Sequence, residues 1–110
     1  MIFINFDNEI KGLICNELIS AEKKFKPFNS AHEGYAILKE EVEELEDNIN
    51  YINEYLNNFW GFTKENSKIG QLKMIEFISI HIENAIKEAI QVAAMCKRFE
   101  KDLGIKNVGQ

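Results

Sequence analysis

The chain has 110 residues, of which 45% are hydrophobic, and a formal net charge of −5 at pH 7. This length predicts one domain, residues 1–110, with a core small enough that self-association would add stability. The acidic balance excludes proteins that bind nucleic acid through a basic surface. No stretch is apolar for long enough to form a signal-peptide core or a membrane span. We therefore expect a cytoplasmic protein without a membrane or nucleic-acid partner.

The N-terminal third predicts one helix followed by a break. Apolar residues recur at helical spacing over residues 8–25, and Asp7 or Asn8 is suited to cap such a helix. Residues 1–7 are expected to be frayed or extended. Pro27, the only proline, ends the helical pattern because its ring excludes the backbone hydrogen bond of a helix interior.

A second helix is predicted over residues 31–60. Ser30-Ala31-His32-Glu33 forms a capping box, in which Ser30 is the N-cap and Glu33 reaches back to it. Gly61 follows directly and is suited to a helix C-terminus. The next stretch is polar and contains two further cap candidates, Thr63 and Ser67.

A third helix is predicted over residues 68–103. It ends at Gly104, a typical helix stop, and Ile105 could pack back against it. Residues 104–110 are expected to be frayed. No segment shows the alternation of a β-strand, so the predicted fold class is all-α, an antiparallel bundle of three to four helices. Cys15 and Cys96 lie in the helical apolar patterns and predict buried thiols in a reducing compartment.

Both long helices carry apolar residues at alternating steps of three and four. The first row is Tyr35, Leu38, Val42, Leu45, Ile49, Ile52, Leu56 and Phe59. The second row is Ile75, Ile78, Ile82, Ala85, Ala89, Val92, Cys96, Phe99 and Leu103. This spacing is typical of helices that pack along a common line, so we expect 31–60 to run antiparallel to 75–103 along these rows.

Acidic residues flank both rows at matching positions. Glu41 and Glu44 flank the first row, and Glu88 and Gln91 flank the second in the same way. In an antiparallel pair these positions face each other, which would bring three carboxylates and one amide together. Glu40 shares the arc of Glu41 and Glu44. A solvated charged face is the alternative interpretation and holds for most Glu-rich helices.

A cluster of carboxylates is electrostatically costly unless a cation lies in it. Carboxylate oxygens select hard cations, so Mg²⁺ or Mn²⁺ is expected first. A di-iron site would need Glu-x-x-His on two helices, and a zinc site would need clustered His or Cys, neither of which the chain has. Mg²⁺ held by a few carboxylates points to phosphate chemistry.

These residues resemble a known family. Glu40-Glu41-Val42-Glu43-Glu44, followed by Glu88-Ala89-Ile90-Gln91, is similar to the paired motifs of the MazG-like, all-α nucleoside triphosphate pyrophosphohydrolases, Glu-Glu-x-x-Glu and Glu-x-x-Asp. The resemblance covers about 28–103. It implies cleavage of the α–β phosphate bond of nucleotides with release of pyrophosphate. It also implies Glu41, Glu44, Glu88 and Gln91 as positions of the metal ligands, and Glu40 as a ligand or water-orienting base.

The chain departs from this family in two ways. Gln91 stands where the family has Asp, and an amide brings no negative charge to the metal, so metal affinity should fall. The stretch 45–87 is also longer than usual. Arg98 and His81 lie on the flank of Glu88 and are weaker candidates for substrate contact. An Arg paired with Asp102 and a histidine that only lines the helix contact are the alternatives.

Three functions remain open at this stage. The first is a Mg²⁺-dependent nucleotide pyrophosphohydrolase that is a homodimer or homotetramer. The second is a binding or regulatory protein of the same fold that has lost turnover. The third is a plain helical oligomerisation module whose acidic stripe keeps it soluble.

Overall fold

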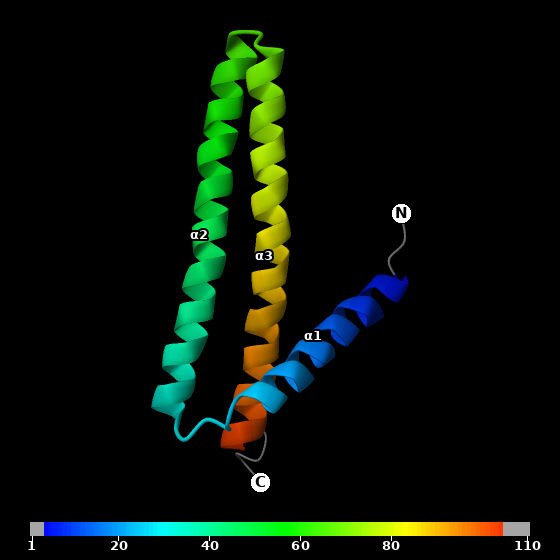
Figure 1. Ribbon diagram of the computed structural model, residues 1–110, viewed down its shortest axis with the longest axis vertical. Coiled ribbons are helices and arrows are strands. Elements are labelled where there is room, and N and C mark those ends of the chain that lie inside the picture. Colours follow the sequence, from blue (N-terminus) through cyan, green and yellow to red (C-terminus); the bar gives the residue numbers. More distant parts are fainter. Residues whose placement is uncertain (1–3, 105–110) are drawn as a thin grey trace. The chain divides into compact units, whose positions relative to one another are not determined.

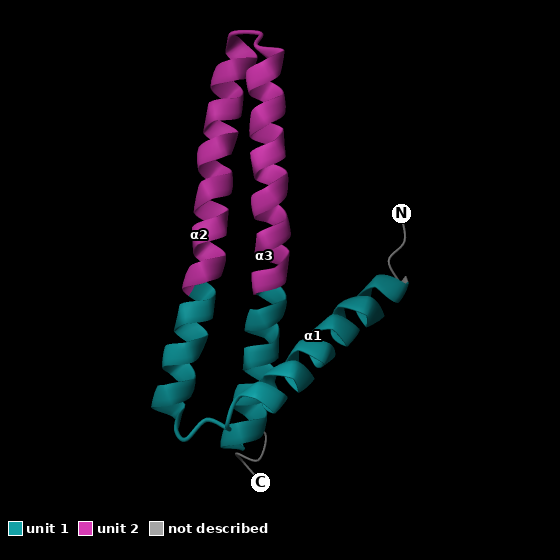
Figure 2. Ribbon diagram, viewed as in Figure 1, with its two compact units in different colours: residues 1–42, 89–110 teal, residues 43–88 magenta. Residues whose placement is uncertain are grey.

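The computed structural model describes residues 4–104, and side chains from residue 5 onward. It contains three helices, α1 (Ile4–Lys24), α2 (Ala31–Lys64) and α3 (Lys68–Leu103), and no strand within that range (Figure 1). The all-α prediction is confirmed. The chain divides into two compact units, unit 1 (residues 1–42 and 89–110) and unit 2 (residues 43–88) (Figure 2). None of the described helices has a stretch apolar enough to cross a membrane.

Unit 1 joins α1 to the start of α2 and the end of α3. Ala21, Phe28 and Met95 form its buried core, and the side chains packed on this core are Ile37, Leu38, Phe99 and Leu103. The Phe28 and Phe99 rings meet edge to face at 6.2 Å between centroids. Gly34 lies beneath them, and a Cβ built there would come within 2.7 Å of the Phe99 ring. A glycine is therefore needed for this close approach of α2 to α3.

The segment between α1 and α2 is held by the C-terminal end of α3. The Phe28 backbone N–H donates to the Asp102 carboxylate at 3.0 Å, and Arg98 Nε lies 3.4 Å from the same carboxylate. Lys101 on α3 donates to Glu22 on α1 at 2.7 Å, and this hydrogen bond raises the pKa of the Lys101 ammonium. Long-range polar contacts thus orient the chain around Pro27.

The ends of the helices test the predicted caps. The Ser30 hydroxyl accepts from the Glu33 N–H at 3.2 Å, which confirms Ser30 as N-cap, whereas the Glu33 side chain accepts from Asn29. Gly104 has φ of 64°, as a helix stop requires. The prediction for Ile105 lies outside the described residues. α1 begins at Ile4, so the predicted caps Asp7 and Asn8 are wrong and lie inside the helix.

Unit 2 is an antiparallel hairpin of α2 and α3. Tyr51 packs on His81 at 5.0 Å between ring centroids, and Tyr55 packs on Phe77 at 5.3 Å. Moving four residues forward on α2 therefore means moving four residues back on α3. The antiparallel prediction for these two helices is confirmed in this unit.

The turn of the hairpin corrects the predicted end of the second helix. α2 continues through Gly61 to Lys64, and the residue with positive φ is Asn66, at 57°. The Ser67 N–H bonds to the Phe62 carbonyl and the Asn66 N–H to the Thr63 carbonyl, the pattern of a Schellman cap. The Ser67 hydroxyl then accepts from the Gly70 N–H and starts α3. Gly61 was a plausible stop, but Asn66 completes the bonds that end the helix.

The predicted contact rows lie only partly in the contact of unit 2. Leu45, Ile52, Phe59 and Ile78 of these rows are half-buried and Ala85 is buried, whereas Ile49, Leu56, Ile75 and Ile82 are 45% to 53% exposed. The ring contacts of Tyr51 and Tyr55 with α3 lie beside the rows. Cys15 and Cys96 are also exposed, so the prediction of buried thiols is wrong. A sequence with two adjacent apolar stripes does not indicate which stripe lies inside.

Candidate functional site

Two acidic residues face each other across the hairpin of unit 2. Glu44 on α2 and Glu88 on α3 offer carboxylate oxygens within 4.8 Å of each other. Their place follows from the pairing of the helices, because Glu44 lies seven residues before Tyr51, and Glu88 seven residues after Tyr51's partner His81. The antiparallel register thus produces the facing carboxylates that the spacing predicts.

The other two predicted ligands, Glu41 and Gln91, belong to unit 1. Both line one cavity of about 280 Å³, together with side chains from the C-terminal half of α1. Glu41 is half-buried and lies one turn before Glu44 on the continuous helix α2. Glu44 and Glu88 therefore form a facing pair in unit 2, and Glu41 and Gln91 form a second pair that lines one cavity of unit 1.

The donor chemistry of these pairs suits a hard divalent cation. Two oxygens bound to one Mg²⁺ ion lie about 3 to 4 Å apart, because each Mg–O distance is about 2.1 Å. The Glu44 and Glu88 oxygens, which lie within 4.8 Å of each other, therefore need only small side-chain adjustments to close on one ion. Carboxylates and an amide, with no histidine or thiol among them, disfavour zinc and copper.

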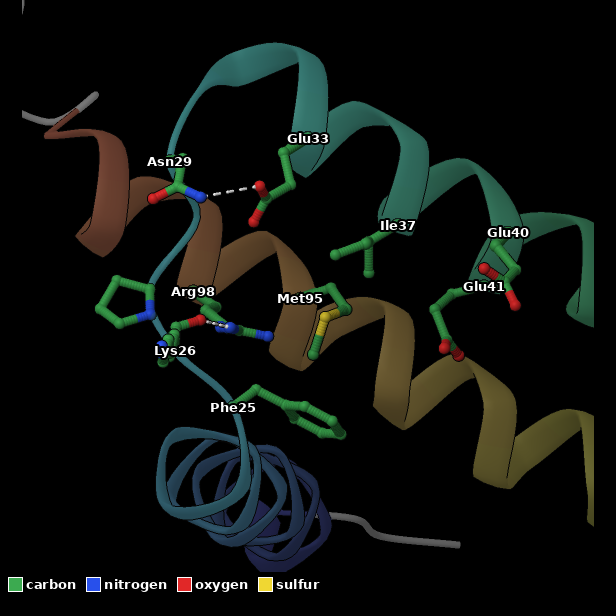
Figure 3. Close-up of a pocket in the computed structure, with 10 residues that line it drawn as sticks. Phe25, Lys26, Asn29, Glu33, Ile37, Glu40, Glu41, Met95 and Arg98 are labelled. Atoms are coloured by element: carbon green, nitrogen blue, oxygen red, sulfur yellow. Dashed lines mark hydrogen bonds between the residues drawn. The ribbon is translucent and has the colours of Figure 1, made fainter.

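A larger cavity of unit 1, about 530 Å³, shares Glu41 with the smaller cavity (Figure 3). Glu40 and Glu41 line it from α2, Met95 and Arg98 from α3, and Phe25 from the segment after α1. The figure shows Ile37 and Met95 pointing into the same space from facing helices. Its volume matches that of small-molecule sites, and its walls are apolar with carboxylates at one end.

The cationic and aromatic residues at the end of α1 and directly after it were not predicted to be functional. Lys24 lines the smaller cavity, Lys26 lines the larger, and Phe25 lines both. Phe25 is 60% exposed, so its ring can contact a bound molecule. No local signal reveals these residues, because their position depends on the long-range contact between the Pro27 segment and the end of α3.

Arg98, a candidate for substrate contact, has structural partners. Its side chain is 4% exposed, pairs with Asp102 and donates to the Lys26 carbonyl. The guanidinium carbon also lies 4.2 Å from the centroid of the Phe28 ring. The pairing with Asp102 that the sequence allowed is therefore present, although Arg98 is buried rather than on the surface. Its contact with substrate stays a prediction.

His81, the other candidate, belongs to the hairpin contact. Its ring packs between Tyr51 and Tyr55, and its Nδ1 lies 3.1 Å from the Asn48 side-chain oxygen. It lines the contact between the helices of unit 2, the alternative that the sequence offered. Its contact with substrate stays a prediction.

Comparison of the chain with models of protein families, with curated proteins and with solved structures finds no match.

Proposed function

We propose that this protein is a Mg²⁺-dependent nucleotide pyrophosphohydrolase that cleaves the α–β phosphate bond of nucleoside triphosphates and releases pyrophosphate. The observation that carries the proposal is the pair of Glu44 and Glu88, whose carboxylates lie within 4.8 Å of each other on facing helices. The resemblance of Glu40–Glu44 and Glu88–Gln91 to the MazG-like motifs supports it. A nucleotide substrate also agrees with the cytoplasmic location expected from the sequence.

In this proposal the acidic residues have different roles, which depend on their positions. Glu41, Glu44 and Glu88 would hold the cation with their carboxylates, and Gln91 would add a neutral amide oxygen. The bound ion would neutralise phosphate charge and lower the pKa of an attacking water. Glu40, beside Glu41 at the larger cavity, would orient that water and accept its proton.

The substrate would lie in the cavities of unit 1. Lys24 and Lys26 line them and would neutralise phosphate oxygens as the substrate enters. The apolar wall of Phe25, Ile37 and Met95 would contact the nucleoside. Acidic and basic side chains thus line the same cavities, as a site for a metal–phosphate complex needs.

A second candidate is a binding protein of the same fold with little or no turnover. The observation that favours it is Gln91, which leaves the site one carboxylate short of the pattern it resembles. A third candidate, an oligomerisation module, gains support from the exposed apolar residues of unit 2. We expect a homodimer or homotetramer for each of these candidates, because so small a core leaves apolar surface to cover.

Two measurements separate these candidates. Pyrophosphate release from a panel of nucleoside triphosphates, with and without Mg²⁺, tests the enzyme. A rise in melting temperature on addition of Mg²⁺ or Mn²⁺, without pyrophosphate release, would indicate the binding protein. No metal response and no release would leave only the oligomerisation module.

A further inference from the structure

The larger cavity of unit 1 has polar side chains at both of its ends. Glu40 and Glu41 lie at one end, and Asn29 and Glu33 lie at the other, where the chain enters α2 (Figure 3). Glu33 and Glu40 are about two helical turns apart on α2, which is about 10 Å along the axis. A nucleoside has about this length. A substrate whose phosphates lie at Glu40 and Glu41 therefore places its base near Asn29 and Glu33.

Apolar side chains line the cavity between these two ends. Phe25 follows α1, Ile37 lies on α2 and Met95 on α3, and Figure 3 shows all three between the polar ends. The Phe25 ring is 60% exposed, so the flat face of a base can stack on it. A purine stacks over a larger area than a pyrimidine, which favours a purine in this part of the cavity.

Asn29 and Glu33 hold each other in place at the polar end. Asn29 Nδ2 donates to Glu33 Oε2 at 3.1 Å, and the Glu33 backbone N–H donates to the Ser30 hydroxyl at 3.2 Å in the first turn of α2. Glu33 is half-buried and makes no ion pair within the described range 5–104. The pair therefore presents the remaining lone pairs of a carboxylate as acceptors, beside the second N–H of an amide as a donor.

Guanine is the standard base that matches this order of groups. Its N1–H and N2–H₂ are adjacent donors, which one carboxylate can accept together, and its O6 beside them accepts from a donor. Adenine and cytosine place a ring nitrogen acceptor next to their amino group, and a carboxylate repels that acceptor. Uracil and thymine place two carbonyl oxygens around their single N–H, so the same repulsion applies.

We propose that Asn29 and Glu33 bind the base of a guanine nucleotide. Glu33 accepts from N1–H and N2–H₂, Asn29 Nδ2 donates to O6, and the purine stacks on Phe25. The assignment names the substrate class of the proposed enzyme, and it rests on that function for the place of the phosphates at the acidic end of the cavity.

Binding of nucleoside monophosphates tests the base contact apart from turnover, because GMP has no α–β phosphate bond to cleave. In isothermal titration with Mg²⁺ present, GMP should bind at least about tenfold more tightly than IMP, which differs only in lacking the N2 amino group. The reason is the loss of one hydrogen bond to a charged acceptor. AMP should bind more weakly than GMP by at least the same factor. Equal affinities of GMP and IMP, or no binding of GMP at millimolar concentration, would overturn the guanine site.

Two substitutions test the residues that contact the base. Glu33→Gln replaces one acceptor by an NH₂ donor, so it should weaken GMP binding by at least about tenfold and leave AMP binding within about threefold of the wild type. Asn29→Ala removes the donor to O6 and should weaken GMP binding by about threefold. Glu43→Gln is the control, since Glu43 is exposed on α2 and lines neither cavity. Retained GMP selectivity in Glu33→Gln, or an equal loss of GMP and AMP binding, would overturn the proposal.

The nucleotide panel separates this inference from the proposed function. With Mg²⁺, pyrophosphate release from GTP should have a kcat/KM at least about tenfold above the values for ATP, CTP and UTP. Release without a preference for GTP would overturn the guanine site and leave the enzyme standing. Selective binding of GMP without release from any nucleotide would overturn the enzyme and leave guanine binding standing.

Discussion

Glu44 on α2 and Glu88 on α3 bring carboxylate oxygens within 4.8 Å of each other across the hairpin of unit 2. Two like charges at this separation repel, and the repulsion falls when a cation binds between them or when one carboxylate is neutralised. Removing one charge therefore has opposite effects on the protein with and without metal.

Glu44→Gln should raise the melting temperature of the metal-free protein by a few degrees and abolish its response to Mg²⁺. In the wild type, binding of the ion to the folded state should raise the stability by about 2.7 kcal/mol at a concentration 100 times the Kd. Glu43→Gln is the matched control, since Glu43 makes the same charge change on the exposed part of α2 beside Glu44. Differential scanning fluorimetry would show the effect, and equal metal responses of wild type and Glu44→Gln would place the site elsewhere.

Gln91→Asp should tighten Mg²⁺ binding, because a fourth carboxylate would face the ion. A tenfold gain corresponds to roughly 1.4 kcal/mol, a plausible size for one charge in a partly hydrated site. If the wild type is a slow enzyme, the variant should also turn over faster at low Mg²⁺. Isothermal titration with Mg²⁺ measures the first effect, and an unchanged or weaker affinity would show that position 91 does not face the cation.

Gly34→Ala should destabilise the protein by about 1 to 2 kcal/mol. A methyl group at this position would lie 2.7 Å from the Phe99 ring, and the crowding outweighs the gain of about 1 kcal/mol in helix propensity. Gly12→Ala is the control, because Gly12 also lies within a helix but a methyl group added there would have nothing within 4 Å. Gly12→Ala should therefore raise the free energy of unfolding measured by urea denaturation. Equal free energies of unfolding for the two variants would contradict the packing of Phe99 over Gly34.

Asp102→Asn should lower the free energy of unfolding by about 3 kcal/mol, since it leaves the Arg98 charge buried without its acidic partner. The Arg98 and Asp102 side chains are only 4% and 8% exposed. Glu100→Gln, an exposed acid two residues earlier on α3, should change the free energy of unfolding by less than about 0.5 kcal/mol. Similar effects of the two substitutions would mean that the Arg98–Asp102 pair does not hold the Pro27 segment.

Local signals in the sequence were sufficient for much of this fold. The start of α2 at Ser30 and the end of α3 at Gly104 were predicted, because each depends on backbone hydrogen bonds to residues nearby. The end of α2 was not, since Gly61 and Asn66 can both end a helix and the sequence does not rank them. The start of α1 was also missed. Asp7 and Asn8 are the first residues in the sequence suited to cap a helix, but α1 begins before them, at Ile4.

The candidate site was predicted in part. The facing of Glu44 and Glu88 followed from the antiparallel register, which the apolar spacing predicts, although some residues of the predicted rows, such as Ile49 and Ile82, are exposed. The contribution of Phe25 and Lys26 depends on contacts with residues more than 70 positions away, such as the hydrogen bond from Phe28 to Asp102. Contacts at that separation leave no trace in local periodicity.

The central claim is that the carboxylates of α2 and α3 support Mg²⁺-dependent release of pyrophosphate from a nucleotide. The most direct measurement is pyrophosphate formation from a panel of nucleoside triphosphates by the wild type and Glu44→Gln, each with Mg²⁺ and with a chelator. The account predicts release from at least one nucleotide by the wild type with Mg²⁺ only, and a loss of at least about 100-fold in Glu44→Gln. No release by the wild type with any nucleotide, or equal release by Glu44→Gln, would contradict it.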